Sequence, residues 1–300
     1  MQVLVSGSTG LVGTALVPAL TEAGHEVIRL LRSATGTATK EITYWDPEHS
    51  SVNLQSLDGV DAVVHLAGES IASGRWSTAR KDRIRSSRVD GTHLLCESLA
   101  HLPKPPRVIV SASAIGYYGS RGDEVLTESS SPGEGYLSEV CQSWEAACEP
   151  ARQAGIRVVN VRFGMILSTA GGALATMLTP FKMGVGGIVG SGRQFVSWVA
   201  IDDVVNAILY VLQSEQISGA VNVTAPHPVS NREFTKTFGK VLGRPTVFPM
   251  PEFAARLAFG EMADELLLSS QRVHPERLQQ AGYTFRLAEL EPALRHVLNR

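Results

Sequence analysis

Apolar runs and helical patterns alternate along the chain from its first residues. Val3–Val5 forms a short apolar run, Leu11–Ala23 has apolar residues at helical spacing before Gly24, and His25–Leu31 is a second apolar run. These patterns predict a strand, a helix and another strand within about thirty residues, the size of one βαβ unit. We therefore expect the chain to begin with two parallel strands joined by a helix.

The same alternation continues as far as Gly164. Buried strands separated by helices are typical of a parallel sheet with helices on both faces, connected by right-handed crossovers. The sequence therefore predicts an α/β fold of the Rossmann type, with a doubly wound parallel sheet. The expected strands are Ile42–Trp45, Ala62–Leu66, Val108–Ser111 and Arg157–Val161, and the expected helices lie near Thr78–Ala100 and Leu137–Ala154.

The pattern changes after Gly164. Glycines are dense between 171 and 192, a strand and a helix are expected within Trp198–Leu212, and Gly219–Thr224 is expected to form one more strand. The rest of the chain has helical patterns with proline-marked turns. We predict a Rossmann core over 1–164, with its sheet completed by parts of 195–224, and a smaller, mainly helical lobe over 165–300.

The composition is typical of a globular protein and argues against several kinds of partner. Apolar residues make up 44% of the chain and charged residues 19%, and the net charge of -2 provides no basic surface for nucleic acid or an anionic membrane. The three cysteines form no CxxC pair, so neither a disulfide framework nor a metal site is expected. No apolar stretch reaches the length of about 18 residues that a membrane-spanning helix needs. We expect a cytoplasmic protein that binds a small-molecule substrate of unknown identity, and its oligomeric state is left open.

A glycine-rich turn follows the first strand and opens the first helix. Gly7 suits a sharp turn, Gly10 lets the backbone approach a pyrophosphate, and Gly13 allows close packing of the helix on the strand. The unpaired N–H groups at the start of such a helix face the phosphates. This order of strand, glycines and helix favours dinucleotide binding over a merely structural turn. The residues expected to contact the cofactor here are Gly7, Ser8, Thr9, Gly10, Leu11 and Val12.

The residue that ends the second strand indicates which dinucleotide binds. NAD enzymes commonly place Asp or Glu there, about twenty residues after the glycines, to bind the ribose 2′-hydroxyl. Here Leu31 and Arg32 occupy this place. An arginine suits a 2′-phosphate and leaves no carboxylate to repel it, so NADP is favoured over NAD. The alternative is that Arg32 is an ordinary surface arginine.

Several strings, in order along the whole chain, resemble one known superfamily, the extended short-chain dehydrogenase/reductases. The glycine spacing is theirs, and residues 61–68 resemble their fourth strand and cofactor loop. Arg88–Thr92 resembles their NVxGT element, with Arg in place of Asn, and Val108–Gly119 resembles their fifth strand. More narrowly, the chain is similar to a small epimerase family, named for nucleotide-sugar epimerases, that has its own C-terminal domain. The strings that carry this likeness are His65–Glu69, Ser87–Arg88, Gly116–Gly119, Trp144–Glu145, Arg162–Gly164, Gly190–Gln194, Ser197–Trp198, Ile201–Asp203 and Gln271–Val273.

The resemblance implies further contacts with the cofactor. Leu66, Ala67 and Gly68 would line its ribose and pyrophosphate, and the segment Gly164–Ile166 would lie near the nicotinamide. Arg88 would lie on the helix behind the sheet and reach the cofactor, where it replaces the Asn acceptor of the superfamily with a positive charge. The alternative for Arg88 is a solvated arginine on the surface of a helix.

Catalysis in the superfamily uses Ser or Thr, Tyr and Lys, with Tyr and Lys spaced YxxxK on one helix. The lysine ammonium lowers the pKa of the phenol, and the serine hydroxyl holds the substrate oxygen. Ser113 matches the serine, with Ser111 as the alternative, and Tyr136 matches the tyrosine at the start of the expected helix. The residue four positions on is Val140, and no lysine follows on this helix.

The missing lysine leaves the proton carrier open. Tyr136 is either the acid/base or an aromatic packing residue, and Glu69, which follows the cofactor loop, is either a base or a helix cap. We expect an NADP-dependent oxidoreductase or epimerase that acts on a small carbonyl or sugar-like substrate held between the two lobes. The missing lysine also supports an alternative, a non-catalytic NADP(H)-binding sensor or partner-docking protein.

Overall fold

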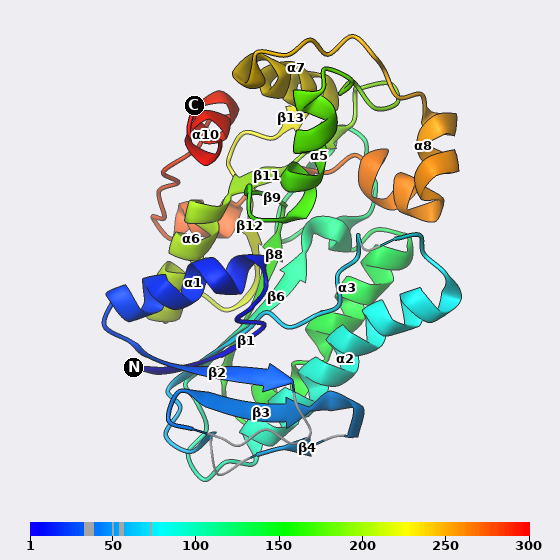
Figure 1. Cartoon of the computed structure of the whole chain (residues 1–300). Coiled ribbons are helices and arrows are strands. Elements are labelled where there is room, and N and C mark those ends of the chain that lie inside the picture. Colours follow the sequence, from blue (N-terminus) through cyan, green and yellow to red (C-terminus); the bar gives the residue numbers. More distant parts are fainter. Residues whose placement is uncertain (33–38, 50, 54–56, 73) are drawn as a thin grey trace.

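The computed structural model describes residues 1–32, 39–49, 51–53, 57–72 and 74–300 of the chain, and its main feature is one large sheet (Figure 1). Within the described residues, eight strands form this sheet. They are β1 (Gln2–Ser6), β2 (Glu26–Arg32), β3 (Ile42–Asp46), β4 (Ser51–Val52), β5 (Ala62–His65), β6 (Val108–Ala114), β8 (Arg157–Phe163) and β12 (Gly219–Val223).

The strand order across the sheet is β12-β8-β6-β5-β1-β2-β3-β4. Neighbouring strands pair in parallel, except that β3 and β4 form an antiparallel pair at one edge. The chain first places β2 and β3 on one side of β1 and then returns to place β5 on the other side. Ligands of open α/β sheets bind at such a switch point, outside the carboxyl ends of the strands.

Helices cover both faces of the sheet because alternate strand residues point to opposite sides. Val3 and Val5 pack with α1 (Leu11–Glu22) and α6 (Ile201–Gln213), whereas Leu4 belongs to the core under α2 (Thr78–Ala100) and α4 (Glu149–Gln153). Figure 1 shows α1 and α6 on one side of the sheet and α2 and α3 (Tyr136–Ala146) on the other. The predicted doubly wound α/β fold is confirmed.

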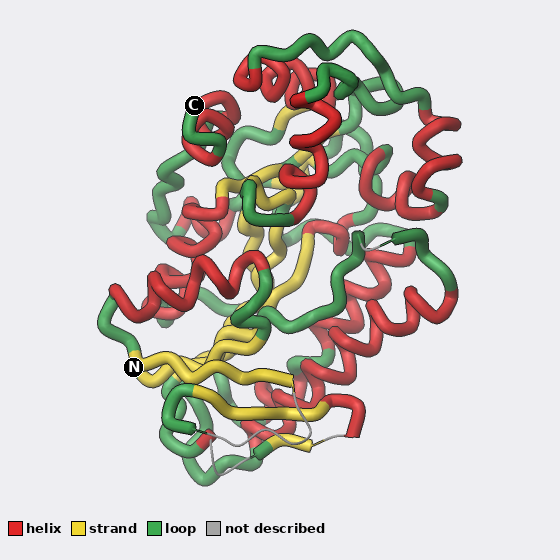
Figure 2. The backbone as a smooth tube through the Cα atoms, viewed as in Figure 1, coloured by secondary structure: helices red, strands yellow, loops and turns green. Residues whose placement is uncertain are grey.

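Most of the elements after β8, apart from α6 and β12, form a smaller, mainly helical lobe with its own core, in which Phe181, Trp198, Phe234 and Phe238 are buried. Figures 1 and 2 show its helices gathered beyond one end of the sheet. Its helices are α5 (Gly172–Lys182), α7 (Asn231–Leu242), α8 (Glu252–Phe259) and α10 (Leu290–Val297), whereas α9 (Glu276–Gln280) packs with the main sheet through Leu278. Short strands pair outside the main sheet: β7 (Val125–Leu126) with β14 (Arg272–Val273), β9 (Met165–Leu167) with β11 (Trp198–Ala200), and β10 (Phe195–Val196) with β13 (Val229–Ser230).

Within 195–224, only β12 joins the main sheet, since β10 and β11 pair elsewhere. The division of the chain at 164/165 stays a prediction. Of the helices in the described residues, none combines the length and the apolar character required to cross a membrane.

Two predicted elements differ from the observed ones. The helix expected over 137–154 is two helices, α3 and α4, because Pro150 lies in the first turn of the second helix. Proline has no N–H to continue an α-helix and its ring collides with the carbonyl four residues earlier, so the first helix ends at Ala146. The strand expected over 108–111 extends to Ala114. Ser113 therefore lies within a strand, not in the loop that follows it.

Candidate functional site

The glycine turn lies at the switch point between β1 and β5, and two of its glycines have no room for a side chain. Gly7 has a φ of +66°, and a Cβ on it would lie 2.6 Å from the carbonyl carbon of Leu66. A Cβ on Gly13 would lie 2.3 Å from the carbonyl oxygen of Gly7. Gly10 precedes α1 and provides no side-chain cap, so the first amide groups of the helix keep their capacity to bind an anion. The turn has the shape and the donors that a pyrophosphate requires.

Ser6 connects this turn to the loop after β5. Its Oγ accepts hydrogen bonds from the N–H groups of Leu66 and Ala67 at 3.2 and 3.3 Å, and lies 2.6 Å from His65 Nδ1. His65 Nε2 lies 3.0 Å from the hydroxyl of Thr92 on α2. Burial lowers the pKa of His65 to about 4, so the imidazole is neutral at physiological pH. His65 thus links β1, β5 and α2 as a structural residue.

β2 carries two arginines, and one of them contacts the glycine turn. Arg29 donates from Nε to the hydroxyl of Ser8 at 3.0 Å. Arg32, at the exposed end of the strand, makes no hydrogen bond or ion pair with the part of the chain that the structure describes. Leu31 between them is half-buried. Arg29 was not among the predicted cofactor residues, although a charged residue inside an otherwise apolar stretch of strand was a signal for it.

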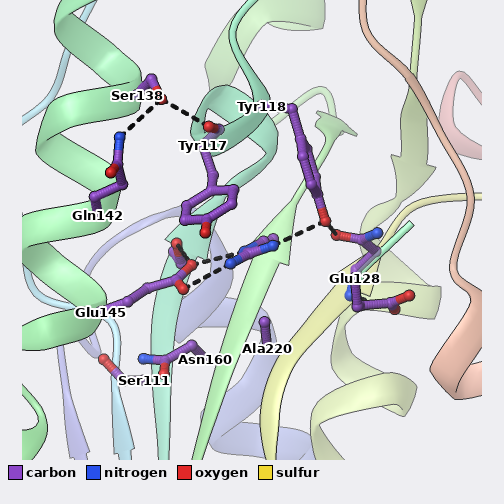
Figure 3. Close-up of polar contacts among 12 residues, drawn as sticks. Ser111, Tyr117, Tyr118, Glu128, Ser138, Gln142, Glu145, Asn160 and Ala220 are labelled. Carbon is purple, nitrogen blue, oxygen red and sulfur yellow. Dashed lines mark hydrogen bonds and ion pairs between the residues drawn. The ribbon is translucent and has the colours of Figure 1, made fainter. Parts of the chain in front are cut away.

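Ser113, the predicted catalytic serine, belongs to a buried charged network. Its hydroxyl donates to Glu145 Oε1 of α3 at 2.7 Å, and Ser113 is 2% exposed. Arg162 of β8 donates to both oxygens of Glu145, at 2.7 Å from Nε and 2.8 Å from Nη2. Figure 3 shows Glu145 extending from its helix toward Tyr117, whose ring centre lies 3.4 Å from Cζ of Arg162. The serine is therefore bound to a carboxylate that already neutralises a buried guanidinium.

The network continues from β8 to β12. Arg162 Nη1 donates to Tyr118 Oη at 2.9 Å, and Tyr118 donates to the side-chain oxygen of Asn222 at 2.8 Å. Burial acts to lower the pKa of Arg162, but its bonds to Glu145 outweigh burial and raise it. Burial raises the pKa of Tyr118 to about 12. Both groups keep their protons at neutral pH, so Arg162 holds Glu145 as a cation and Tyr118 donates its hydroxyl hydrogen to Asn222.

Tyr136 begins α3, and its side chain packs against α2, where its hydroxyl already has a hydrogen-bond partner. The hydroxyl donates to the carbonyl oxygen of Lys81 at 2.6 Å, and the ring meets Trp76 edge-on with ring centres 5.2 Å apart. Lys81 Nζ lies 4.6 Å from the centre of the Tyr136 ring. Burial raises the pKa of Tyr136, and the charge of Arg88 opposes this rise. Ser113 and Tyr136 thus have different hydrogen-bond partners in this structure.

Glu69 anchors the loop after β5 to α2. Its carboxylate forms an ion pair with Arg80, with Oε1 3.0 Å from Nη1, and its N–H donates to the hydroxyl of Ser87 at 3.1 Å. Arg80 also donates to the carbonyl oxygen of Ser70. The role of Glu69 as a base stays a prediction.

Arg88 is half-buried on α2 beside the cofactor loop. Its Nη1 donates to the carbonyl oxygen of Ile84 at 3.0 Å, and its Cζ lies 5.0 Å from the centre of the Trp144 ring. A Cβ on Gly68 would lie 3.4 Å from Arg88 Cζ. The structure therefore brings Arg88 to the loop that the sequence assigns to the cofactor.

Gly164 and Ile166 lie where the sheet meets the lobe. The N–H of Gly164 donates to the carbonyl oxygen of Val223 at 3.2 Å, and a Cβ on Gly164 would lie 2.6 Å from the carbonyl oxygen of Ser197. Ile166 is half-buried on β9, in register with Val199 of β11. Close backbone packing explains the glycine, and the predicted contact of this segment with nicotinamide stays a prediction.

Cys96, Cys141 and Cys148 are buried and free. Burial raises the pKa of Cys141 to about 12, so this thiol is no nucleophile at neutral pH. In the described residues, His, Cys, Asp and Glu side chains form no group of three or more that could hold a metal ion. The chemistry of the site therefore depends on the cofactor loops, the arginines and the hydroxyl groups described above.

Residues 3–224 match the family described as the NAD dependent epimerase/dehydratase family. The chain belongs to this family. Residues 250–297 match a domain of unknown function, DUF1731. The resemblance to an epimerase family with its own C-terminal domain is confirmed.

Similar members of the epimerase family cover the chain from end to end. Epimerase family protein MT2273 of Mycobacterium tuberculosis is 43% identical over 298 residues, which are 99% of this chain and 98% of that protein. The crystal structure of human epimerase family protein SDR39U1 with NADPH is 34% identical, has a TM-score of 0.91 and matches 100% of both chains. The nucleoside-diphosphate sugar epimerase from Corynebacterium glutamicum is 39% identical with a TM-score of 0.81, and the match covers 99% of this chain but 58% of that one.

Proposed function

We propose that this member of the epimerase family is a cytoplasmic NADP(H)-dependent oxidoreductase or epimerase that acts on a small carbonyl or sugar-like substrate. One observation carries the proposal: β2 ends at Arg32 and not at a carboxylate, and its Arg29 donates to Ser8 of a glycine turn in which Gly7 and Gly13 have no room for a side chain. The human relative with a TM-score of 0.91, whose structure contains NADPH, supports the same conclusion.

The residues present fit the cofactor. The amide groups at the start of α1 would bind the pyrophosphate, and the Leu66–Gly68 loop, held by Ser6, would line it. Arg32 would bind the 2′-phosphate, with Arg29 holding Ser8 at the same edge of the turn. When bound, NADP(H) supplies hydride transfer.

On the substrate side, the protein offers hydroxyl groups and carboxylates that are already paired. Ser113 is polarised by Glu145, so it would hold a substrate oxygen only after rotating away from this carboxylate. Tyr136 would have to leave the carbonyl oxygen of Lys81 to exchange a proton. Glu69, paired with Arg80, is the third candidate for the proton carrier.

These occupied hydroxyl groups favour a second candidate function, a non-catalytic protein that binds NADP(H) and reports its redox state or docks a partner. The cofactor contacts are the same in both functions, so cofactor binding does not separate them. Turnover of a substrate separates the enzyme from the non-catalytic protein.

The cofactor part of the proposal is tested by measuring the binding of NADPH and NADH to the whole chain and to Arg32→Asp. The substitution should weaken NADPH binding by about tenfold or more, because it removes a charged hydrogen bond to the phosphate, and should weaken NADH much less. Equal weakening of both cofactors would disprove the 2′-phosphate role of Arg32. Reduction of NADP by a panel of alcohols, sugars and nucleotide sugars then tests the enzyme, and tight NADPH binding without any turnover would favour the sensor.

A further inference from the structure

Two departures from the superfamily pattern face each other where α2 meets α3. Val140 stands in the place of the usual lysine, and Arg88 stands in the place of the usual asparagine. Tyr136, Val140 and Trp144 are spaced four residues apart on α3, so they lie on one face of the helix. Tyr136 donates to a carbonyl group of α2, and Trp144 donates to a hydroxyl group of α2 at 2.9 Å. Val140, which lies between them, is therefore on the face of α3 that meets α2.

Arg88 lies on the opposing face of α2. Its guanidinium is 5.0 Å from the Trp144 ring and 3.4 Å from the position of a Cβ on Gly68, measured from Cζ. It therefore occupies the space between the cofactor loop and the helix that begins with Tyr136. Burial lowers the pKa of Arg88, and its interactions with neighbours that include Tyr136 and Glu69 oppose this effect.

The guanidinium of Arg88 has donors left for a ligand. Of its five N–H groups, one on Nη1 donates to the carbonyl oxygen of Ile84. Across the residues that the structure describes, no carboxylate lies within ion-pair distance of Arg88. A half-buried cation without a paired carboxylate costs desolvation free energy, which hydrogen bonds to a bound ligand would offset.

We propose that Arg88 takes over from α2 the role of the missing lysine: it donates hydrogen bonds to the nicotinamide-ribose half of NADP(H) and adds its positive charge to that of Lys81 on the side of α2 that meets Tyr136. The proposal rests on the proposed function. The two departures then compensate each other, because the cation has moved from α3 to the neighbouring helix while a valine fills the place it left. Arg88 is a binding residue for the cofactor and a positioning residue for Tyr136.

The charge of Arg88 acts on Tyr136 together with other groups. Burial disfavours the phenolate, and a nearby cation favours it. The charged side chains that act on Tyr136 are Lys81, Asp82, Arg85 and Arg88 of α2, and Glu261 just before the π-helical turn Ala263–Leu267. Among them, Arg88 also lies beside the cofactor loop, where its Cζ is 3.4 Å from the position of a Cβ on Gly68.

The binding role is tested with two probes, NADPH and adenosine 2′,5′-bisphosphate, which contains the 2′-phosphate but no nicotinamide ribose. Arg88→Met should weaken NADPH by about tenfold and leave the bisphosphate unchanged, and Arg88→Lys should weaken NADPH less. Arg83→Met, an exposed arginine of the same helix, is the matched control. Equal binding of NADPH by the chain and by Arg88→Met would overturn the proposal.

The exchange of the cation between helices gives a second, independent test. The double variant Arg88→Asn with Val140→Lys restores the usual pattern of both helices and should recover most of the NADPH affinity that Arg88→Asn alone loses. A merely structural arginine would show no such recovery, so failure of the double variant to exceed Arg88→Asn would contradict the proposal.

The effect on Tyr136 is measured by ultraviolet titration of the phenols. The contribution of Tyr136 is the difference between each protein and its Tyr136→Phe counterpart, since the chain has six tyrosines. Arg88→Met should raise the pKa of Tyr136, and an unchanged titration would remove the positioning role. If the unsubstituted chain binds the bisphosphate, and Arg88→Met raises the pKa of Tyr136 without weakening NADPH, the cofactor half of the proposal fails. If the unsubstituted chain binds neither probe, the proposed function itself fails.

Discussion

The hydroxyl of Ser113 donates a 2.7 Å hydrogen bond to Glu145, which connects the carboxyl end of β6 to α3. The same carboxylate is held by Arg162 of β8, and both charged side chains are nearly buried, with exposed fractions of 4% for Arg162 and 13% for Glu145. Glu145 is thus the point at which α3, β6 and β8 meet. Its charge is required there because Arg162 has no other carboxylate among its hydrogen-bond partners in the described residues.

Replacing Glu145 by Gln should destabilise the protein strongly. The substitution keeps the shape of the side chain and removes the negative charge, which leaves the Arg162 guanidinium buried without a counter-ion. Breaking one partner of a buried pair costs about 3–5 kcal/mol of the free energy of unfolding. Unfolding in urea, followed by circular dichroism, measures this loss.

Ser113→Ala is the matched control for Glu145→Gln. It removes one hydrogen bond to the same carboxylate and leaves the ion pair with Arg162 intact, so it should cost about 1.5–3 kcal/mol at most. A loss for Ser113→Ala as large as that for Glu145→Gln would show that the hydroxyl, not the charge, holds the network together.

Arg29 should contribute to the preference for a 2′-phosphate. Its Nε donates to Ser8 inside the glycine turn, which leaves the N–H groups of Nη1 and Nη2 for an anion at the turn. Arg29→Met should reduce the ratio of NADPH to NADH affinity by about tenfold, since a charged hydrogen bond is lost for one cofactor only. Isothermal titration with both cofactors gives this ratio.

The control for Arg29 is Arg107→Met at the other end of the sheet. Arg107 is exposed and forms a surface ion pair with Asp61 at 3.6 Å, far from the carboxyl ends of the strands. Arg107→Met should leave the ratio of NADPH to NADH affinity unchanged. A ratio that Arg29→Met also leaves unchanged would limit Arg29 to holding Ser8.

The sequence predicted the fold well because the fold follows from local patterns. The helix α2 spans Thr78–Ala100, as predicted, and the structure adds that Ser77 caps its start by accepting from the N–H of Arg80. The glycine turn was recognised because its order of strand, glycines and helix is local as well. The break between α3 and α4 was not predicted, because the apolar pattern continues across Pro150 while this proline, in the first turn of α4, ends the first helix.

The contacts of the candidate site were not predictable from these patterns. Ser113 and Glu145 are 32 residues apart in the chain, and Tyr136 and Glu265 are 129 apart. Periodicity shows which face of an element is buried, but it does not show which side chains from different elements meet. The partners of Ser113 and Tyr136, and so the occupied state of their hydroxyl groups, needed the structure.

His65 should make the stability of the protein depend on pH. Burial lowers its pKa from 6.5 to about 4, so between these values the unfolded chain binds a proton that the folded chain does not. The free energy of unfolding is therefore complete above pH 6.5 and falls as the pH drops toward 4, by about 3 kcal/mol in total from this group. Below pH 4, both states are protonated and His65 adds no further loss.

The measurement is urea unfolding at several pH values between 4.5 and 7. His65→Gln keeps a polar side chain between Ser6 and Thr92 but does not titrate. The free energy of unfolding of this variant should therefore fall less steeply with decreasing pH, by the slope that one proton contributes. Parallel pH profiles for the two proteins would contradict the assignment of this dependence to His65.

Glu265 caps the helix that begins with Tyr136, and its removal should loosen the contact between the lobe and α3. Oε1 accepts from the N–H of Tyr136 at 3.1 Å, and Oε2 accepts from the N–H of Leu137 at 3.2 Å. Gly135, the residue before α3, has no side chain to satisfy these donors. From the π-helical turn Ala263–Leu267, Glu265 therefore acts as the N-terminal cap of α3. Its negative charge also favours the positive end of the helix.

Glu265→Ala should lower the free energy of unfolding by about 1–2 kcal/mol, the value of a helix cap. Glu265→Gln should lower it less, because its amide oxygen still accepts one of the two hydrogen bonds. Asp264→Ala is the matched control, since its carboxylate is half exposed and pairs with Arg256 on the surface, where an ion pair contributes little. Hydrogen exchange of the Tyr136 and Leu137 amides locates the effect. Faster exchange at these two amides in Glu265→Ala, but not in Asp264→Ala, is the expected result, and unchanged exchange in both would show that α3 needs no cap from the lobe.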